Sequence, residues 1–262
     1  MKSQLDEIDL EKLVDIVLST KSIFMDQQSA KKITAKGAVD FVTQTDFQIQ
    51  NIIQNELSRL YPSIQMMGEE KDNIDLDPDA PMWILDPVDG TTNLIHDFHH
   101  SAISLALVVK KDVIIGIIYL PFEDELFYAQ KNKGAYLNEK VISVSSSQSL
   151  QECLVGIGTN PYNRNDSEIT FTSCRKIFDE CQDIRCIGSA AMALAYVACG
   201  RLDAFFERNL KPWDYAAGIL LINEAHGTVT DLDGEMVSIA HASDIVASNR
   251  IIHQQLMKCA LP

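Results

Sequence analysis

The chain has 262 residues, of which 46% are hydrophobic and 23% are charged, so it is long enough and apolar enough to bury a sizeable core. This composition excludes a collagen-like, low-complexity or disulfide-scaffold protein. The formal net charge of −15 disfavours nonspecific binding to a nucleic acid polymer or to an anionic membrane surface.

The spacing of apolar residues predicts the elements in chain order. Two amphipathic helices are expected at about 5–30 and 46–60. Strands are expected at 64–67, 82–85, 103–109, 113–120 and 125–129. The polar break at 110–112 separates two long apolar runs, which predicts a hairpin in an antiparallel sheet that is covered on both faces.

A serine-rich segment at 143–149 is the weakest seam in the chain, and the pattern changes after it. Strands are expected at 154–157, 203–206, 228–230 and 245–247, and helices at 167–180, 189–199, 213–225 and from 251 onward. We therefore expect an N-terminal α+β subdomain, 1–145, and a C-terminal α/β subdomain, 146–262, that form one catalytic unit. Helices that cover both faces of sheets predict a layered enzyme scaffold.

The cysteines and the N-terminus indicate the compartment. All six cysteines lie in the second half of the chain and none forms a CxxC pair, which is typical of a reduced cytosolic protein. The first residues are charged and amphipathic, and no apolar run is long enough to span a bilayer. We expect a cytoplasmic protein without a membrane partner.

The segment 83–93, with the sequence WILDPVDGTTN, is predicted to bring two carboxylates and several backbone N–H groups to one point. A buried strand is expected to end at Asp86. Gly90 permits a sharp turn into Thr91 and Thr92, which can cap a following helix.

The chemistry of this segment suits a cation and a phosphate. Unpaired carboxylates ~4 Å apart repel by about 4 kcal/mol at an effective dielectric of 20, so Asp86 and Asp89 favour a bound cation. Their oxygens and the Val88 carbonyl are hard ligands of the kind that Mg²⁺ prefers. The N–H groups of Gly90 and Thr91 suit a phosphate group. The alternative interpretation is a capped turn with surface acids.

Two further acids stand at the end of an expected strand or at the start of an expected helix. Glu69 comes after an apolar run and Gly68, and Asp214 follows Trp213 at an expected helix start. Each alone has an ordinary explanation, as an exposed loop or as pairing with a helix dipole. Together with the segment 83–93, in this order and spacing, they resemble the inositol monophosphatase family. The resemblance covers nearly the whole chain and includes the segments 116–129, 134–138 and 188–191.

This resemblance implies a five-layered αβαβα sandwich, as in inositol monophosphatase and fructose-1,6-bisphosphatase, and a Mg²⁺-dependent, lithium-sensitive phosphomonoesterase. The leading substrate is myo-inositol monophosphate, as one of the small phosphorylated alcohols. The expected partner is this substrate, and the expected assembly is a homodimer.

The resemblance also implies roles for individual residues. Two or three Mg²⁺ ions, with Mn²⁺ as the alternative ion, are expected at one site. Their ligands are Glu69, Asp86 and the Val88 carbonyl for the first ion, and Asp86, Asp89 and Asp214 for the second. The catalytic residues are Glu69 and Thr91, which orient the attacking water, and Asp46, which polarises the Thr91 hydroxyl. The substrate contacts are Asp89, Gly90, Thr91, Thr92, Gly188, Ser189, Ala190, Glu207 and Asp214.

The substrate stays open between several members of the superfamily. Leu94 stands where an aromatic residue is common, and the stretch 207–212 is more basic than in many inositol-specific relatives. Both lie beside the expected leaving-group pocket. The alternatives are fructose-1,6-bisphosphatase, 3′(2′),5′-bisphosphate nucleotidase, NADP phosphatase and histidinol phosphatase, and, outside catalysis, a regulatory binding protein on the same fold.

Two other signals are weaker. Three histidines at 96, 99 and 100 have a spacing that can bind zinc, but no HExxH base accompanies them. The segment 156–161 has two glycines after a strand but lacks the third glycine of a dinucleotide-binding turn. We expect neither a zinc site nor a dinucleotide site.

Overall fold

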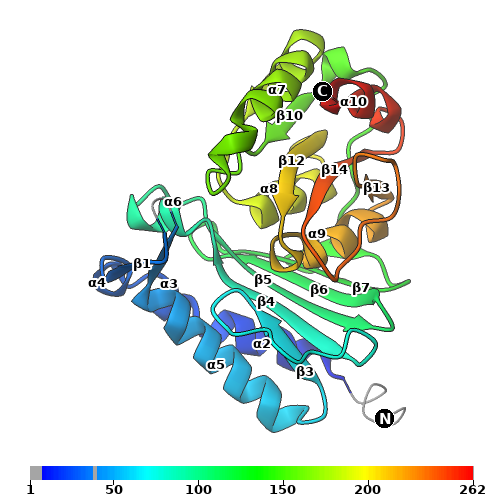
Figure 1. The fold of residues 1–262 in the computed structure, drawn as a ribbon. Helices are drawn as coiled ribbons and strands as arrows, with labels where there is room; N and C mark the ends of the chain where they lie inside the picture. Colours follow the sequence, from blue (N-terminus) through cyan, green and yellow to red (C-terminus); the bar gives the residue numbers. More distant parts are fainter. Residues whose placement is uncertain (1–7, 38–39, 262) are drawn as a thin grey trace.

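A computed structural model describes residues 8–37 and 40–261, and its elements stack as five alternating layers of helix and sheet (Figure 1). The predicted αβαβα sandwich is confirmed. The layers are, in order, α2 (Leu10–Ser19) with α5 (Gln44–Leu60), a seven-stranded sheet, α8 (Ala190–Ala198) with α9 (Pro212–Glu224), a five-stranded sheet, and α7 (Ser167–Glu180) with α10 (His253–Ala260).

The seven-stranded sheet carries most of the first half of the chain. Its order is β3 (Gln65–Gly68), β4 (Met82–Asp89), β5 (Ala102–Val109), β6 (Asp112–Leu120), β7 (Glu125–Gln130), β8 (Ala135–Leu137) and β9 (Lys140–Val141). Only β3 and β4 are parallel, and the pairing of β5 with β6 confirms the predicted hairpin. Side chains of β4 alternate between two cores, because Trp83 and Leu85 face α5 while Met82 and Ile84 face α8 and α9.

The five-stranded sheet has the order β11 (Asp183–Arg185), β10 (Leu154–Ile157), β12 (Ala204–Leu210), β14 (Ser243–Asn249) and β13 (Gly227–Thr230). The strands β11, β10 and β12 are parallel, and β14 runs antiparallel to β12 and β13. Its outer face packs on α7 and α10 through a separate core.

Small residues let the central helices approach closely. A Cβ on Gly116 of β6 would lie 2.7 Å from the carbonyl oxygen of Ala217, so α9 sits directly on the first sheet. A Cβ on Gly218 would lie 2.6 Å from the side chain of Leu194, so α8 and α9 are also in close contact. This packing fixes the N-terminal end of α9 relative to strand β4.

The expected first helix at about 5–30 is wrong as a single element, and its residues 5–7 lie outside the described chain. Three helices replace it: α2, α3 (Lys21–Phe24) and α4 (Gln27–Ala30). The Asp9 and Asp26 side chains cap α2 and α4, and the Thr20 hydroxyl bonds the Val17 carbonyl, so local side chains compete with a continuous helix.

Other boundaries differ from the expectation for local reasons. Helix α5 starts at Gln44 because Thr43 and Asp46 form a capping box. Strand β12 continues to Leu210, and α10 begins at His253 rather than at 251. The short elements β1 (Ile33–Ala35), β2 (Phe41–Thr43), β8, β9 and β11 were not expected, and neither were the 3₁₀ turns η1 (Leu150–Glu152) and η2 (Arg164–Asp166).

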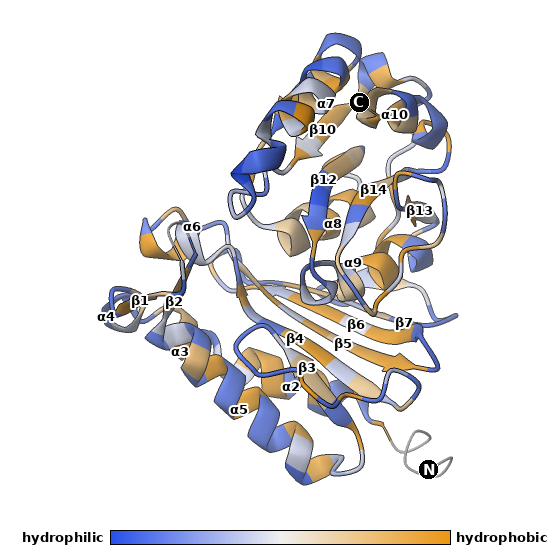
Figure 2. Cartoon of the chain, viewed as in Figure 1, coloured by the Kyte–Doolittle hydropathy of each residue, from blue (hydrophilic) through white to orange (hydrophobic). Residues whose placement is uncertain are grey.

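Hydrophobic residues follow the layers. Figure 2 shows them concentrated on β5 to β7 and on α9, while α5 alternates between hydrophilic and hydrophobic residues along its length. Among the described helices, none combines the length and the apolarity needed to cross a lipid bilayer.

Candidate functional site

A cavity of about 750 Å³ opens where the two sheets and the central helices meet. Six acids line it, and they come from the first sheet, from β12, from α9 and from the segment that joins β1 to β2. These acids are Asp40, Glu69, Asp86, Asp89, Glu207 and Asp214. Three basic residues, Lys36, Arg164 and Lys211, also line the cavity, so six acids against three bases leave it with a net charge of −3, a part of the −15 of the chain.

Three aspartates form a compact cluster at its base. Asp86 and Asp89 come from β4, and Asp214 comes from the first turn of α9. One carboxylate oxygen of each lies within 4.8 Å of the others, and no second such group of three His, Cys, Asp or Glu residues occurs in the described part of the chain. The strand β4 does not end at Asp86 as expected. It continues to Asp89 with a register shift against β5, and such an irregularity re-aims side chains.

Burial and mutual repulsion make the aspartates difficult to ionise together. Burial is the largest cause that raises the pKa of Asp86 and of Asp214 well above the ordinary value, and neighbouring acids raise both further. Burial also raises the pKa of Asp89 to about 6, against hydrogen bonds that lower it. A divalent cation relieves this repulsion, and carboxylate oxygens are the ligands that Mg²⁺ prefers. The donor set therefore fits Mg²⁺.

Asp89 is held by the start of α8. Its Oδ2 accepts hydrogen bonds from the Ser189 hydroxyl at 2.5 Å and from the Ala191 N–H at 2.6 Å. The Asn93 amide donates to the carbonyls of His100 and Ile187, which ties the turn after β4 to the segment before α8. The residues 188–190, which were predicted to contact the substrate, therefore lie next to Asp89.

The turn at Gly90 needs glycine. Its φ is +88°, and a Cβ there would lie 2.9 Å from the His100 carbonyl oxygen. Gly90 is the N-cap of α6 (Thr91–Ile95), so the expectation that the threonines cap this helix is wrong. The Thr91 side chain lies inside the first turn and has other partners.

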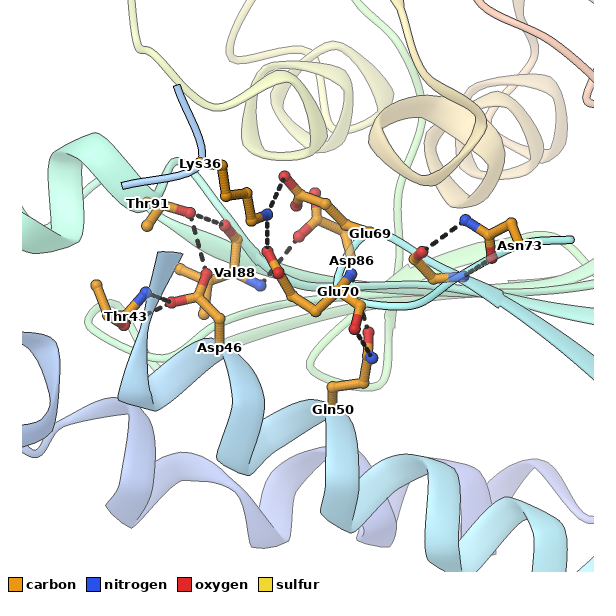
Figure 3. Close-up of polar contacts among 11 residues, drawn as sticks. Lys36, Thr43, Asp46, Gln50, Glu69, Glu70, Asn73, Asp86, Val88 and Thr91 are labelled. Atoms are coloured by element: carbon orange, nitrogen blue, oxygen red, sulfur yellow. Dashed lines mark hydrogen bonds and ion pairs between the residues drawn. The ribbon is translucent and has the colours of Figure 1, made fainter. Parts of the chain in front are cut away.

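Thr91 and Asp46 meet across 45 positions of sequence. The Thr91 hydroxyl lies 3.1 Å from Asp46 Oδ1 and 3.0 Å from the Val88 carbonyl oxygen (Figure 3). Asp46 Oδ2 accepts hydrogen bonds from the N–H and the hydroxyl of Thr43. Burial is the largest cause that raises the pKa of Asp46, and these hydrogen bonds oppose it. The capping box of α5 therefore also orients the acid that contacts Thr91.

Glu69 follows the end of β3 and faces a lysine that the sequence did not single out. Lys36 Nζ lies 3.8 Å from a Glu69 oxygen and forms an ion pair with Glu70 (Figure 3). Burial raises the pKa of Glu69 to about 7, although Lys36 opposes the rise. Lys36 carries no pattern in the sequence that could have identified it, because its role depends on how the β1–β2 segment folds over the site.

Glu207 lies on the opposite side of the cavity. A Cβ on Gly158 would be 1.9 Å from its carboxylate, and the Asn160 N–H donates to it at 3.2 Å. Burial raises the pKa of Glu207 to about 7. The register shift in β12 beside Glu207 places this carboxylate at the cavity wall.

Almost all of the predicted site residues line one cavity. The exceptions are Asp46 and Ser189, which lie behind the wall and bond Thr91 and Asp89. The histidines at 96, 99 and 100 form no metal cluster within the described residues.

Comparisons with known proteins agree with this geometry. A family model described as "Inositol monophosphatase family" matches residues 2–261. The inositol-1-monophosphatase of Rhizobium meliloti (strain 1021) is 38% identical over 225 residues, which are 86% of this chain and 84% of the relative. The inositol monophosphatase of Dictyostelium discoideum is 40% identical over 232 residues, which are 86% of this chain and 85% of the relative. The solved structure of extragenic suppressor protein suhB from Bartonella henselae matches with a TM-score of 0.90 at 34% identity, over 96% of this chain and 98% of that one.

Proposed function

The chain belongs to the inositol monophosphatase family, and we propose that it hydrolyses myo-inositol monophosphate with Mg²⁺ held by the acids of the cavity. As a member of this family it is a phosphoric monoester hydrolase. The observation that supports the proposal most strongly is the cluster of Asp86, Asp89 and Asp214 beside the Thr91–Asp46 pair in one cavity.

The residues that hold the ions are those that the family resemblance implies. Glu69, Asp86 and the Val88 carbonyl bind one Mg²⁺, and Asp86, Asp89 and Asp214 bind another. Mg²⁺ held there would supply an acidified water and positive charge beside the phosphate and the leaving oxygen. Burial raises the pKa of Asp86, Asp89 and Asp214, and neighbouring acids add to the rise at Asp86 and Asp214, which supports this assignment because a carboxylate that is hard to ionise favours a positive neighbour.

The chain's own residues position the attacking water. The Thr91 hydroxyl donates a hydrogen bond to Asp46 Oδ1, so that the lone pairs of the Thr91 oxygen can accept a hydrogen bond from water. Glu69 orients the same water from the other side. Burial of Asp46, with its second oxygen bonded to Thr43, keeps this arrangement rigid.

Other residues of the cavity hold the substrate. The N–H groups of Gly90 and Thr91, with Thr92, bind the phosphate oxygens, and Gly188 and Ala190 line this side of the pocket, with Ser189 behind them on Asp89. Glu207, Asp89 and Asp214 contact the alcohol. A carboxylate at this place accepts hydrogen bonds from the hydroxyls of a polyol, which favours inositol over a substrate with an apolar alcohol.

The proposal also covers the compartment, the partners and the assembly of the protein. The negative charge and the reduced cysteines support a cytoplasmic protein that binds no nucleic acid polymer, and the family resemblance supports a homodimer. Residues 1–145 and 146–262 serve as two subdomains of one catalytic unit, because the acids come from both.

A substrate panel tests the function. Phosphate release is measured with Mg²⁺ on myo-inositol 1-phosphate, fructose 1,6-bisphosphate, adenosine 3′,5′-bisphosphate, NADP and histidinol phosphate. The expected result is the highest kcat/KM on the inositol phosphate and inhibition by lithium. Preference for another member of the panel contradicts the inositol assignment. No release from any of them contradicts hydrolysis and favours a binding role.

A further inference from the structure

Two side-chain amides hold the backbone on both sides of Glu69. The Gln50 amide donates from Nε2 to the Glu70 carbonyl at 2.8 Å, and its Oε1 accepts from the Glu70 N–H at 3.3 Å. The Asn73 amide donates from Nδ2 to the Gly68 carbonyl at 2.9 Å, and its Oδ1 accepts from the Gly68 N–H at 3.0 Å. Figure 3 shows both pairs of hydrogen bonds, at the residues that precede and follow Glu69 in the chain.

The position of β3 explains why these amides are needed. It is the edge strand of its sheet, so the N–H and C=O groups on its outer side have no neighbouring strand. Asn73 satisfies both groups of Gly68 at that edge. After Gly68 the backbone pairing with β4 ends with the hydrogen bond from the Glu69 N–H to the Leu85 carbonyl. At Glu70 the side-chain amide of Gln50 bonds the backbone N–H and C=O in place of a strand.

The approach of Gln50 is closely fitted. Its side chain is 5% exposed in the interior face of α5, and a Cβ on Gly68 would lie 2.8 Å from its Oε1. A side chain at position 68 would therefore push the Gln50 amide away from its present place at Glu70. Gly68, Gln50 on α5 and Asn73 in the following loop therefore together hold the backbone around Glu69.

Glu69 needs such support more than the other acids do. Asp86 and Asp89 lie on the second strand of the sheet, whereas Glu69 follows an edge strand and has a longer side chain. It lines the same cavity as Asp86, so its carboxylate must reach the cavity from the end of that edge strand. Ordering a glutamate side chain costs about 1.5–2 kcal/mol of rotamer entropy, and a mobile backbone adds to this cost.

We propose that Gln50 and Asn73 are positioning residues, which fix the backbone of Gly68 and Glu70 so that the Glu69 carboxylate is held ready for Mg²⁺ and for the attacking water. This inference rests on the proposed function, because it assigns the two amides to the same site. Neither residue lines the cavity.

The variants that test it are Gln50→Ala and Asn73→Ala, with Gln54→Ala as a matched control. Gln54 lies one turn further along α5, is partly exposed, and makes no side-chain hydrogen bond among the described contacts. The change in helix propensity is the same at both glutamines. Gln50→Met and Asn73→Leu keep roughly the size of each side chain and remove both hydrogen bonds without adding a charge beside Glu69, so they serve if an alanine variant fails to fold.

Mg²⁺ binding is measured by calorimetry on the substrate-free protein, and turnover is measured as a function of Mg²⁺ concentration. Removal of groups that orient metal ligands typically weakens metal affinity about 10–100-fold, and we expect a weakening in this range for Gln50→Ala and Asn73→Ala. We expect kcat to recover at saturating Mg²⁺, and Gln54→Ala to bind Mg²⁺ as the wild type does. A purely structural role would instead lower the melting temperature and leave the Mg²⁺ affinity unchanged.

The outcomes separate this inference from the proposed function. Wild-type Mg²⁺ affinity in the folded Gln50 and Asn73 variants overturns the inference and leaves the phosphatase assignment intact. Weakened Mg²⁺ binding in the variants, with no hydrolysis of inositol phosphate by the wild type, supports the positioning role and overturns the substrate assignment. A wild-type protein that binds no Mg²⁺ overturns both.

Discussion

Replacing Asp214 with asparagine is expected to stabilise the metal-free protein and to abolish its hydrolysis of phosphate esters. The substitution keeps the shape of the side chain, and its oxygen can still accept the hydrogen bond of 2.7 Å from the Lys211 N–H. It removes one negative charge from the cluster with Asp86 and Asp89. The two effects have opposite signs because the same charge repels its neighbours and attracts the cation.

The magnitude follows from the geometry. Carboxylate oxygens within 4.8 Å of one another repel by about 3.5 kcal/mol per pair at an effective dielectric of 20. Protonation limits this cost, since the pKa of Asp214 is raised, so we expect a net gain of about 2 kcal/mol in the free energy of unfolding at pH 8. This gain corresponds to roughly 4–8 °C in melting temperature.

The dependence on pH gives a second signature. A carboxyl group with a raised pKa binds more protons in the folded state than in the unfolded state, so the metal-free wild type loses stability as pH rises above the ordinary pKa of aspartate. The advantage of Asp214→Asn should therefore grow between pH 5 and pH 8. Mg²⁺ at 100 times its dissociation constant adds about 2.7 kcal/mol to the wild type, and the variant should lose most of this gain.

The assay is thermal unfolding with EDTA and with Mg²⁺, combined with phosphate release. Loss of one metal ligand removes several kcal/mol of charge stabilisation, which predicts a fall in kcat/KM of at least about 100-fold. Asp15→Asn, at an exposed position of α2, is the control and should change stability by less than about 0.5 kcal/mol. A metal-free Asp214→Asn protein that melts below the wild type would refute the electrostatic reasoning.

Three further predictions concern other parts of the structure. Thr91→Val removes the hydroxyl that contacts Asp46, so kcat should fall about 10²-fold with little change in Mg²⁺ affinity; an unchanged kcat would contradict its role. Gly158→Ala places a Cβ 1.9 Å from the Glu207 carboxylate, so KM for inositol phosphate should rise several-fold more than KM for p-nitrophenyl phosphate. Burial lowers the pKa of His253, so the free energy of unfolding of the wild type should fall below about pH 6.5, by up to ~1.4 kcal/mol per pH unit. Urea unfolding of His253→Gln should lack this dependence on pH, and an equal dependence in both proteins would contradict the role of His253.

The residues that could be predicted from the sequence are those whose role is visible in a short segment. Asp86, Asp89 and Gly90 stand in one turn whose geometry follows from strand, proline and glycine, and Asp214 follows a recognisable helix start. The layered fold was also predictable, because the long apolar runs of β5 and β6 require cover on both faces.

The supporting residues could not be found in this way. Lys36, Gln50 and Asn73 are single polar residues in a hairpin, a helix and a loop, and nothing in their local sequence separates them from solvated neighbours. Their roles arise only when β3 ends beside α5. The first helix was predicted too long for a related reason, since single polar side chains, Thr20 at the end of α2 and Asp26 at the start of α4, interrupt a continuous apolar pattern.

The acids of this site stay close together because the hydrophobic cores hold them there. Asp86 lies on β4 between the buried side chains of Leu85 and Val88, and α9 carries Asp214 while burying Leu220, Leu221 and further apolar residues. Full burial of one leucine side chain contributes about 1.5–3 kcal/mol, so the packing of α9 on the sheet exceeds the repulsion of about 3.5 kcal/mol between two carboxylates. The metal-free protein cannot relax by moving the helix away, and it protonates its acids instead. A cation that binds displaces these protons and meets carboxylates that the packing already holds together, which is why the site needs rigid layers behind it.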